Sequence, residues 1–191
     1  MLSLLRPAFT LFVLLSLLTG IAYPLAVTGV AMLAFPQAAG GSLVFRDGRP
    51  VGSELIGQNF ADPRYFWGRP SATLPMPYNG AASGGSNQGP ANPALAAAVR
   101  RRIEALRAAD PGNALPVPVD LVTASASGLD PDISTAGAEY QAPRVAAARS
   151  LRPDQVLALV AQHAQRRRVG FLGESRVNVL RLNLALDALQ P

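Results

Sequence analysis

The sequence predicts an α+β fold in which a single N-terminal transmembrane helix is followed by one mixed α/β extracytoplasmic domain. Residues 7–45 carry no charge and are largely apolar. The next segment places apolar residues on both sides of an Asp-Gly pair, which is typical of a β-hairpin. Further on, apolar residues recur at intervals of three and four, which indicates amphipathic helices. The predicted divisions are a cytoplasmic N-terminus at 1–7, a transmembrane helix at 8–35, a linker at 36–41 and a domain at 42–191.

The uncharged segment is long enough to cross a bilayer. A helix needs only about 20 apolar residues to span a hydrocarbon core of roughly 30 Å. A cleaved signal peptide is the alternative, because Arg6 precedes the segment and the small residues at 38–40 follow it. The apolar region of a signal peptide is typically about 7–15 residues long, so the sequence favours a retained anchor.

The anchor contains residues that weaken an isolated helix. Gly20, Pro24 and Gly29 lie within the predicted span. A membrane helix tolerates such residues where neighbouring helices satisfy the backbone groups that they leave unpaired. We therefore expect these three positions to contact partner subunits.

The charges that flank the anchor predict its orientation. Arg6 and the α-amino group lie at its N-terminal end, whereas no cation follows until Arg46. The positive-inside rule then places the N-terminus in the cytoplasm and the domain outside it.

The composition excludes several kinds of chemistry. All 17 basic side chains are arginine and none is lysine, which excludes a P-loop lysine, Schiff-base chemistry and Ser-Lys dyads. The absence of cysteine excludes thiol catalysis, disulfides and Cys-based zinc sites. The net charge of +5 is spread thinly apart from arginine clusters at 100–102 and 166–168. With few aromatics among them, we expect solvated or subunit-facing surface and no nucleic-acid binding. Membrane lipid is an expected partner of the anchored chain.

The predicted domain begins with a hairpin and a long loop. Strands are expected at 42–45 and 50–56, joined through Asp47 and Gly48. Residues 71–91 are rich in Gly, Pro, Ser and Asn, so no regular element is expected there. Loops of this length are uncommon in a compact domain unless they are functional or order against a partner.

Helices dominate the rest of the prediction. The first begins at Asn92 and Pro93, a good N-cap and a good first position, and ends near Asp110. Its apolar stripe is Leu95, Val99, Ile103 and Leu106. We then expect an extended segment at 116–122, two short helices at 135–141 and 143–149 divided by Pro143, and a helix at 153–168. The tail at 177–189 alternates leucines as a strand would, but its length and Leu/Ala composition favour a helix.

Few residues offer catalytic or metal chemistry. The sole histidine, His163, lies on a predicted helix just before three arginines, where a structural role is favoured over that of a general base. Asp130 and Asp132 could bind a hard cation together with Ser127 and Ser134. The alternative, that the two aspartates cap their own loop, is favoured. The residues alone predict no catalytic site and no metal site.

A glycine-rich run offers a weak nucleotide signal. The backbone N–H groups of Ser83, Gly84, Gly85, Ser86, Asn87 and Gln88 could cradle a phosphate. The run lacks the lysine of a P-loop and the strand and helix that would flank one.

A set of motifs in a fixed order covers essentially the whole chain: Gly52–Phe60, Tyr65–Ala72, Ser83–Asn87, Asn92-Pro93, Asp120–Pro131, Gln141–Ala146, Gly173–Leu180 and Leu182–Asp187. In this order, behind a single N-terminal span, they resemble the KdpC family, the C subunits of bacterial potassium-transporting P-type ATPases. Two positions depart from the family pattern, since Asp132 stands where histidine is expected and Ser175 where proline is expected.

The resemblance implies a non-hydrolysing subunit of a high-affinity potassium uptake complex in the bacterial inner membrane, with the domain in the periplasm. The implied partners are the channel-like KdpA, the ATP-hydrolysing KdpB and the small KdpF. The family is needed for assembly and is proposed to raise the ATP affinity of KdpB as a catalytic chaperone. The chain then has no cofactor of its own, and ATP would be met through the complex, at Ser83–Gln88, which resembles the signature loop of ABC transporters. We assign Tyr65, Trp67 and Arg69 as further candidate partner contacts.

The predicted orientation conflicts with that nucleotide role, because ATP is cytoplasmic and the domain is expected outside. A cap on the extracellular face of KdpA that influences ion entry without touching ATP is therefore the preferred alternative. Two other hypotheses remain from different classes. One is a membrane-anchored hydrolase or metal-dependent enzyme that uses Asp130, Asp132 and Ser127, and the other is a free-standing ligand-binding module.

Overall fold

The computed structural model describes residues 2–167, 170 and 172–189. It divides into two compact units, one up to Pro50 and one from Val51 onward. This division falls later in the chain than the predicted start of the domain at Ser42. The mixed helix and sheet content behind one apolar helix confirms the predicted fold class.

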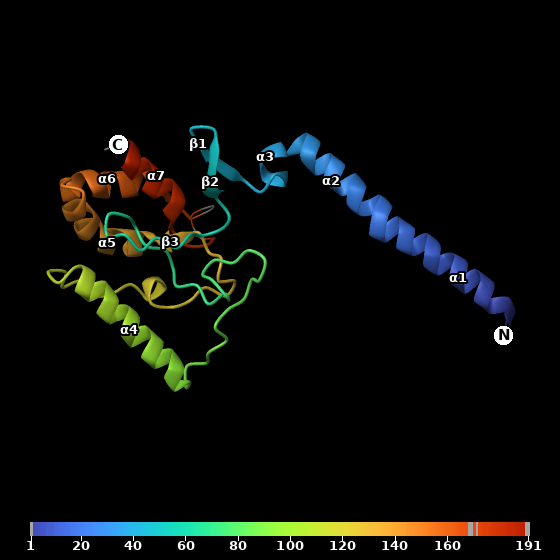
Figure 1. Ribbon diagram of the computed structural model, residues 1–191, viewed down its shortest axis with the longest axis horizontal. Coiled ribbons are helices and arrows are strands. Elements are labelled where there is room, and N and C mark those ends of the chain that lie inside the picture. The colour runs from blue at the N-terminus through green and yellow to red at the C-terminus, as the bar shows by residue number, and fades with distance from the viewer. Residues whose placement is uncertain (1, 168–169, 171, 190–191) are drawn as a thin grey trace. The chain divides into compact units, whose positions relative to one another are not determined.

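The first unit is mostly one long apolar helix (Figure 1). Its segments are α1 (Leu2–Leu17), a π-helical turn η1 (Leu18–Ala22) and α2 (Tyr23–Ala34). Residues Ser3–Ala34 are long and apolar enough to cross a membrane, and none of them is buried. The helix includes residues 2–7, which the sequence predicts to belong to a cytoplasmic N-terminus.

Pro24 accounts for the π-helical turn. A proline has no N–H to donate to the carbonyl four residues earlier, and its ring crowds that carbonyl. The chain widens by one residue before it, so that the N–H of Tyr23 donates to the carbonyl of Leu18, five residues back. The Thr19 hydroxyl donates to the carbonyl of Leu15 at 2.7 Å. The proline therefore alters the helix locally without ending it.

The predicted linker forms a helical turn, α3 (Pro36–Ala39), before the hairpin. The hairpin pairs β1 (Leu43–Arg46) with β2 (Arg49–Ser53). Asp47 and Gly48 have φ angles of 51° and 73°. Two successive positive φ angles are those of a type I′ turn, which confirms the hairpin predicted from the Asp-Gly pair.

The second unit is built on a small antiparallel sheet. Its strands are β3 (Asp132–Ser134), β4 (Ala164–Gln165) and β5 (Arg176–Asn178), in the order β3-β5-β4. Ile133 pairs with Val177, and both side chains are buried. Helix α5 (Thr135–Ala148) packs against α6 (Pro153–His163), and α6 packs against α7 (Val179–Leu189). The largest fully buried side chains lie between these elements and the loop before them: Phe66, Ile133, Leu182, Leu186, Gln141, Val145, Val156, Val160, Val177 and Asn183.

Helix α4 (Pro93–Ala109) forms where it was predicted. The Asn92 side chain accepts from the N–H of Ala94 at 2.9 Å, as an N-cap does. Within the predicted apolar stripe, Leu106 is buried, and Val99 and Ile103 pack against the core. A single 3₁₀ turn, η2 (Val119–Leu121), occupies the segment predicted to be extended.

Two predicted helix boundaries are wrong. Helix α5 runs through Pro143 without stopping. Pro143 and Glu139 both lie on its exposed face, so water can solvate the carbonyl that the proline leaves unpaired, while the opposite face is buried. Helix α6 ends at His163, because Ala164 and Gln165 pair with β5. The predicted helical residue Arg168 lies outside the described residues. In the tail, a short strand precedes the helix that was favoured.

Between Ile56 and Pro93 the chain has no helix and no extended strand (Figure 1). This confirms the predicted loop at 71–91 and extends it backward to include residues 62–70, which contain Trp67 and which we call the aromatic segment.

Candidate interaction surfaces

Two buried amide side chains hold the aromatic segment. The N–H of Phe66 donates to Oδ1 of Asn183 at 2.8 Å, and Nδ2 of Asn183 donates to the carbonyl of Phe66 at 3.0 Å. Gln141 pairs with the N–H and carbonyl of Trp67 in the same way, at 2.9 and 3.1 Å. These side chains pair the backbone as a neighbouring strand would, which is why Phe66 can be completely buried in a loop.

Arg144, which lies on helix α5, also holds the aromatic segment. Its guanidinium lies 4.1 Å from the centre of the Trp67 ring and donates to the carbonyls of Pro63 and Tyr65, at 2.5 and 3.1 Å. The side chain is only 5% exposed. Burial lowers the pKa of Arg144 to about 10, so the group still carries its charge at neutral pH.

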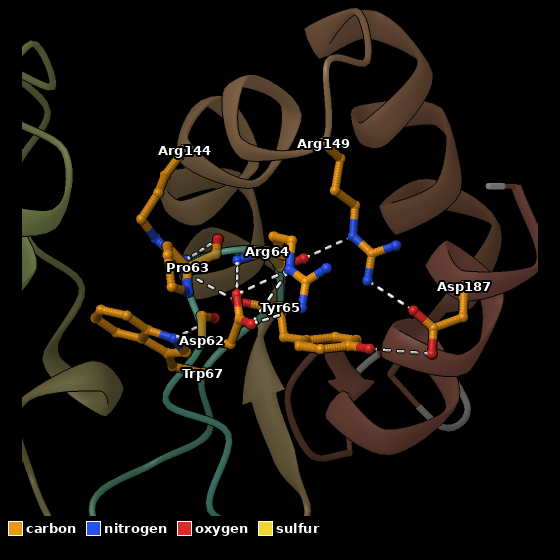
Figure 2. Close-up of polar contacts among 8 residues, drawn as sticks. All are labelled: Asp62, Pro63, Arg64, Tyr65, Trp67, Arg144, Arg149 and Asp187. Carbon is orange, nitrogen blue, oxygen red and sulfur yellow. Dashed lines mark hydrogen bonds and ion pairs between the residues drawn. The ribbon is translucent and has the colours of Figure 1, made fainter. Parts of the chain in front are cut away.

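A second arginine joins this segment to the C-terminal helix (Figure 2). Arg149 donates to Oδ1 of Asp187 at 2.7 Å and to the carbonyl of Arg64 at 2.7 Å. The Tyr65 hydroxyl donates to the other carboxylate oxygen of Asp187 at 3.2 Å. The guanidinium also lies 4.7 Å from the Tyr65 ring centre. Tyr65 and Trp67, two candidate partner contacts, are thus half-buried and engaged inside the domain.

Asp62 closes the turn that leads into this segment. It accepts from the backbone N–H of Arg64 at 2.8 Å and from the Arg64 guanidinium, also at 2.8 Å. These hydrogen bonds lower the pKa of Asp62 to about 2. The pair is exposed to solvent, so it fixes the local turn without adding to the core.

The third candidate contact, Arg69, lies between two cavities. Its Nη1 donates to Asp130 at 3.0 Å, and its buried Nε has no hydrogen-bond partner. One cavity, of about 220 Å³, is lined by Arg69, Asp120, Asp130, Asp132, Glu174 and Arg176 among others. The other, of about 270 Å³, is lined by Arg69, Tyr78, Arg102 and uncharged residues. Arg69 is therefore partly accessible but neutralised by Asp130.

The carboxylates proposed as cation ligands are paired with cations of the chain itself. Arg176 lies 3.1 Å from Asp132, just as Arg69 pairs with Asp130. Burial raises the pKa of Asp132. Oδ1 of Asp130 accepts from the N–H of Asp132 at 3.0 Å, which is an Asx turn. Within the described residues, no group of three or more His, Cys, Asp or Glu side chains is placed to hold a metal ion.

The two serines proposed as their companions cap local structure. Ser134 is the N-cap of α5, where its hydroxyl accepts from the N–H of Gly137 at 2.9 Å and donates to Asp120 at 3.0 Å. The Ser127 hydroxyl accepts from the N–H of Leu129 at 3.1 Å. These contacts agree with the alternative interpretation, in which the polar residues of this loop cap local structure and do not bind a cation.

The glycine-rich run lies along a second loop. The N–H of Gly84 and the hydroxyl of Ser83 both donate to the carbonyl of Ser127, at 2.9 and 3.0 Å. A Cβ at Gly85 would lie 2.7 Å from the carbonyl oxygen of Ala126, so only glycine allows this approach. Ser86 and Asn87 are exposed, and Gln88 is half-buried. The N–H of Gly84 is therefore not free to bind a phosphate, whereas the backbone at Ser86 and Asn87 remains exposed.

The remaining candidates lie apart from these loops. His163 is the half-buried last residue of α6, and burial and Arg181 lower its pKa. In the anchor, a Cβ at Gly20 or Gly29 would meet nothing within 4 Å, which leaves both positions open to a neighbour. Pro24 lies at the start of α2 in the same exposed helix.

Sequence reasoning missed the residues that hold the aromatic segment. Gln141, Arg144 and Asn183 are the buried polar groups at its centre. A signal existed, because Asn183 interrupts the apolar face of its helix between Leu180 and Leu186. A buried amide at such a position requires a polar partner.

Comparison with known proteins identifies the family. The model of the KdpC family, described as the c chain of K⁺-transporting ATPase, matches residues 5–188. A potassium-transporting ATPase KdpC subunit from Variovorax paradoxus (strain S110) is 71% identical over 97% of this chain and 96% of its own length. Those from Polaromonas naphthalenivorans (strain CJ2) and Dechloromonas aromatica (strain RCB) are 69% and 65% identical, over 99% and 98% of this chain and 96% and 98% of their own lengths. The family predicted from the motifs is confirmed: this chain belongs to the KdpC family of potassium-transporting ATPase subunits.

Proposed function

We propose that this chain is the accessory C subunit of an ATP-driven potassium uptake complex in the bacterial inner membrane. The observation that carries the proposal is the combination of one exposed apolar helix with a domain whose polar groups are largely engaged with one another. The names of its relatives support the same assignment. Its partners are the channel-like KdpA, the ATP-hydrolysing KdpB and the small KdpF.

The proposed subunit performs no catalysis and carries no cofactor of its own. The carboxylates that an enzyme would use are neutralised by Arg69 and Arg176. Burial and the neighbouring Arg181 lower the pKa of His163, which favours its neutral form. Neither provides the carboxylate that orients the imidazole of a catalytic histidine. Ser127 and Ser134 cap local structure. The hydrolase hypothesis therefore has no nucleophile paired with a base among these candidates.

The proposed role of the anchor is to dock as well as to tether. A carbonyl left unpaired in hydrocarbon costs several kcal/mol, so the turn before Pro24 needs either internal or neighbouring hydrogen bonds. Gly20 and Gly29 leave space at which another helix could approach closely. We infer that this surface packs against partner helices in the membrane.

The proposed orientation places the domain in the periplasm. The cation distribution supports this through Arg6 at the cytoplasmic end. There the domain would cap the outer face of the channel-like subunit and affect ion entry without touching ATP.

A second candidate function is that of a catalytic chaperone which raises the ATP affinity of the hydrolysing subunit. The exposed backbone at Ser86 and Asn87 favours it, because glycine-rich backbone at a surface can approach a phosphate. This function requires the domain to face the cytoplasm, or to transmit its effect through the membrane helices.

Recovery of the complex tests the assignment. The affinity-tagged chain, purified in mild detergent from membranes of potassium-limited cells, should bring down the P-type ATPase and its channel-like subunit. Gly29→Leu should reduce that recovery. Ala31→Leu, which introduces the same side chain on another face of α2, is the control. Recovery of the wild-type chain alone would contradict the proposed function.

Topology separates the two modes of action. Because the chain has no cysteine, Ser86→Cys provides a unique labelling site. A membrane-impermeant maleimide should label it in cells with a permeable outer membrane and should not label it in inverted vesicles. The reverse result would place the domain beside cytoplasmic ATP and favour the chaperone role.

A further inference from the structure

The long loop carries an exposed apolar tip. Residues 74–77, Leu-Pro-Met-Pro, are all exposed to solvent. The side chain of Leu74 is 77% exposed and that of Met76 is 58% exposed. Exposed apolar side chains are common when scattered singly, but here they are adjacent at the end of one loop. We call residues 74–77 the apolar tip.

The base of the apolar tip is fixed by hydrogen bonds. The buried Thr73 hydroxyl donates to the carbonyl of Met76 at 2.8 Å and accepts from the N–H of Asn79 at 3.0 Å. The Asn79 side chain donates to the carbonyl of Leu74 at 2.9 Å. Ser71 accepts from the N–H of Tyr78 at 2.9 Å and donates to the carbonyl of Gly128 at 2.7 Å. The tip is therefore preformed and needs little ordering when it binds.

Tyr78 fastens the loop to the domain. Its hydroxyl donates to the carbonyl of Arg69 at 2.5 Å. A Cβ at Gly57 would lie 2.4 Å from the Tyr78 ring, and one at Gly68 would lie 2.6 Å from its hydroxyl oxygen, so two glycines make room for this side chain. Its φ angle is 55°, a left-handed conformation that is unfavourable for a bulky residue. Such strain persists where the surrounding structure holds it, and it often accompanies a functional site.

The chemistry around the apolar tip indicates what it binds. Residues 70–99 contain no charged side chain. Two cations share a cavity with Pro77, and both are engaged: Arg69 pairs with Asp130, and Arg102 donates to the carbonyl of Val122. A segment that inserts into lipid headgroups usually carries cations or Trp beside its apolar residues. A charged partner surface would lose solvation against this tip without gaining an opposite charge. An uncharged protein recess suits it best.

We propose that the apolar tip is a preformed docking element that inserts Leu74 and Met76 into an uncharged recess on another subunit of the potassium-transporting ATPase. The proposal rests on the proposed function, since it requires that complex. It adds a specific contact outside the membrane to the packing of the anchor.

Charge substitution tests the contact. The double variant Leu74→Glu, Met76→Glu should weaken association of the chain with the ATPase about 100-fold, because burying unpaired carboxylates costs several kcal/mol. The matched control is Leu115→Glu, Val119→Glu, two exposed apolar side chains elsewhere in the domain. Thermal unfolding of each isolated chain should stay near that of the wild type, because the altered side chains are exposed.

Accessibility gives a second readout. Met76→Cys should be labelled quickly by a maleimide in the isolated detergent-solubilised chain and slowly in the assembled complex. Ala108→Cys, on the exposed face of α4, controls for reagent access.

The outcomes separate the two proposals. Failure of the wild-type chain to recover the ATPase would overturn the proposed function. Normal recovery of the ATPase by the double glutamate variant, with Met76→Cys labelled equally in both states, would overturn the docking proposal alone. Protection of Met76→Cys by lipid vesicles without other subunits would assign the tip to the membrane and also overturn it.

Discussion

The aromatic segment at 62–70 and the loop at 71–91 are neighbours in the chain, and neither forms a helix or a strand, yet they are held in opposite ways. Distant residues hold the first, since Gln141 and Asn183 pair its backbone from two different helices. The second is held mainly by its own hydroxyl and amide groups, such as Thr73 and Asn79. The difference indicates that the first segment contributes to the stability of the whole domain, whereas the second mainly determines the shape of a surface.

The largest expected effect comes from removing a buried amide that holds the aromatic segment from a helix distant in sequence. Asn183→Leu keeps a similar volume but leaves the buried N–H and carbonyl of Phe66 unpaired, which should destabilise the domain by about 4 kcal/mol. Trp67, the only tryptophan, reports unfolding of the full-length chain in urea. The exposed Asn59→Leu should change stability little. If Asn183→Leu lowers the free energy of unfolding by less than about 1 kcal/mol, the Asn183 amide does not hold the aromatic segment as inferred.

A smaller effect is expected where the glycine-rich run meets the 125–128 loop. Gly85→Ala forces a Cβ to within 2.7 Å of the Ala126 carbonyl oxygen, whereas Gly84→Ala meets nothing within 4 Å. We expect a loss of about 2 kcal/mol for the first and below about 0.5 kcal/mol for the second. Thermal unfolding of the two variants, measured side by side, checks this difference. Equal melting temperatures would show that the two loops do not depend on their close approach.

The loop at 71–91 should respond only locally when one of its own hydroxyl groups is removed. Thr73→Val preserves shape but removes the hydroxyl that pairs with Met76 and Asn79, so the tip should loosen while the domain loses only about 1–2 kcal/mol. Hydrogen exchange should accelerate at the N–H of Asn79 and remain unchanged at the N–H of Phe66. Acceleration at both sites would remove the distinction between the two segments.

The smallest effect is expected from pH. Hydrogen bonds from Arg64 lower the folded-state pKa of Asp62 to about 2, below the usual value for an aspartate. Its contribution is therefore present above about pH 4 and is lost as the pH falls towards 2. Asp62→Asn should flatten this part of the acid unfolding curve and lower stability at pH 7 only slightly, because the ion pair is exposed. An unaltered curve would mean that the turn at Asp62 does not depend on its charge.

Local signals predicted the fold well where they acted alone. The Asp-Gly turn, the Asn92 cap and the apolar anchor each depend on neighbours in sequence. The prediction failed where tertiary packing decided, because the buried face of α5 outweighs Pro143 and the pairing with β5 ends α6 at His163. The motifs predicted the family, but not the residues that act between segments. Asn183 pairs with Phe66 across 117 positions, which no local pattern encodes.

The π-helical turn has a consequence for the membrane. One extra residue in a helix rotates everything beyond it by about 100°. A stripe of side chains that runs along α1 therefore does not continue on the same side of α2. The half of the helix before Leu18 and the half after Ala22 present different faces to their surroundings. A helix that crosses a membrane with such a turn in it can meet one neighbour in one leaflet and a different neighbour in the other.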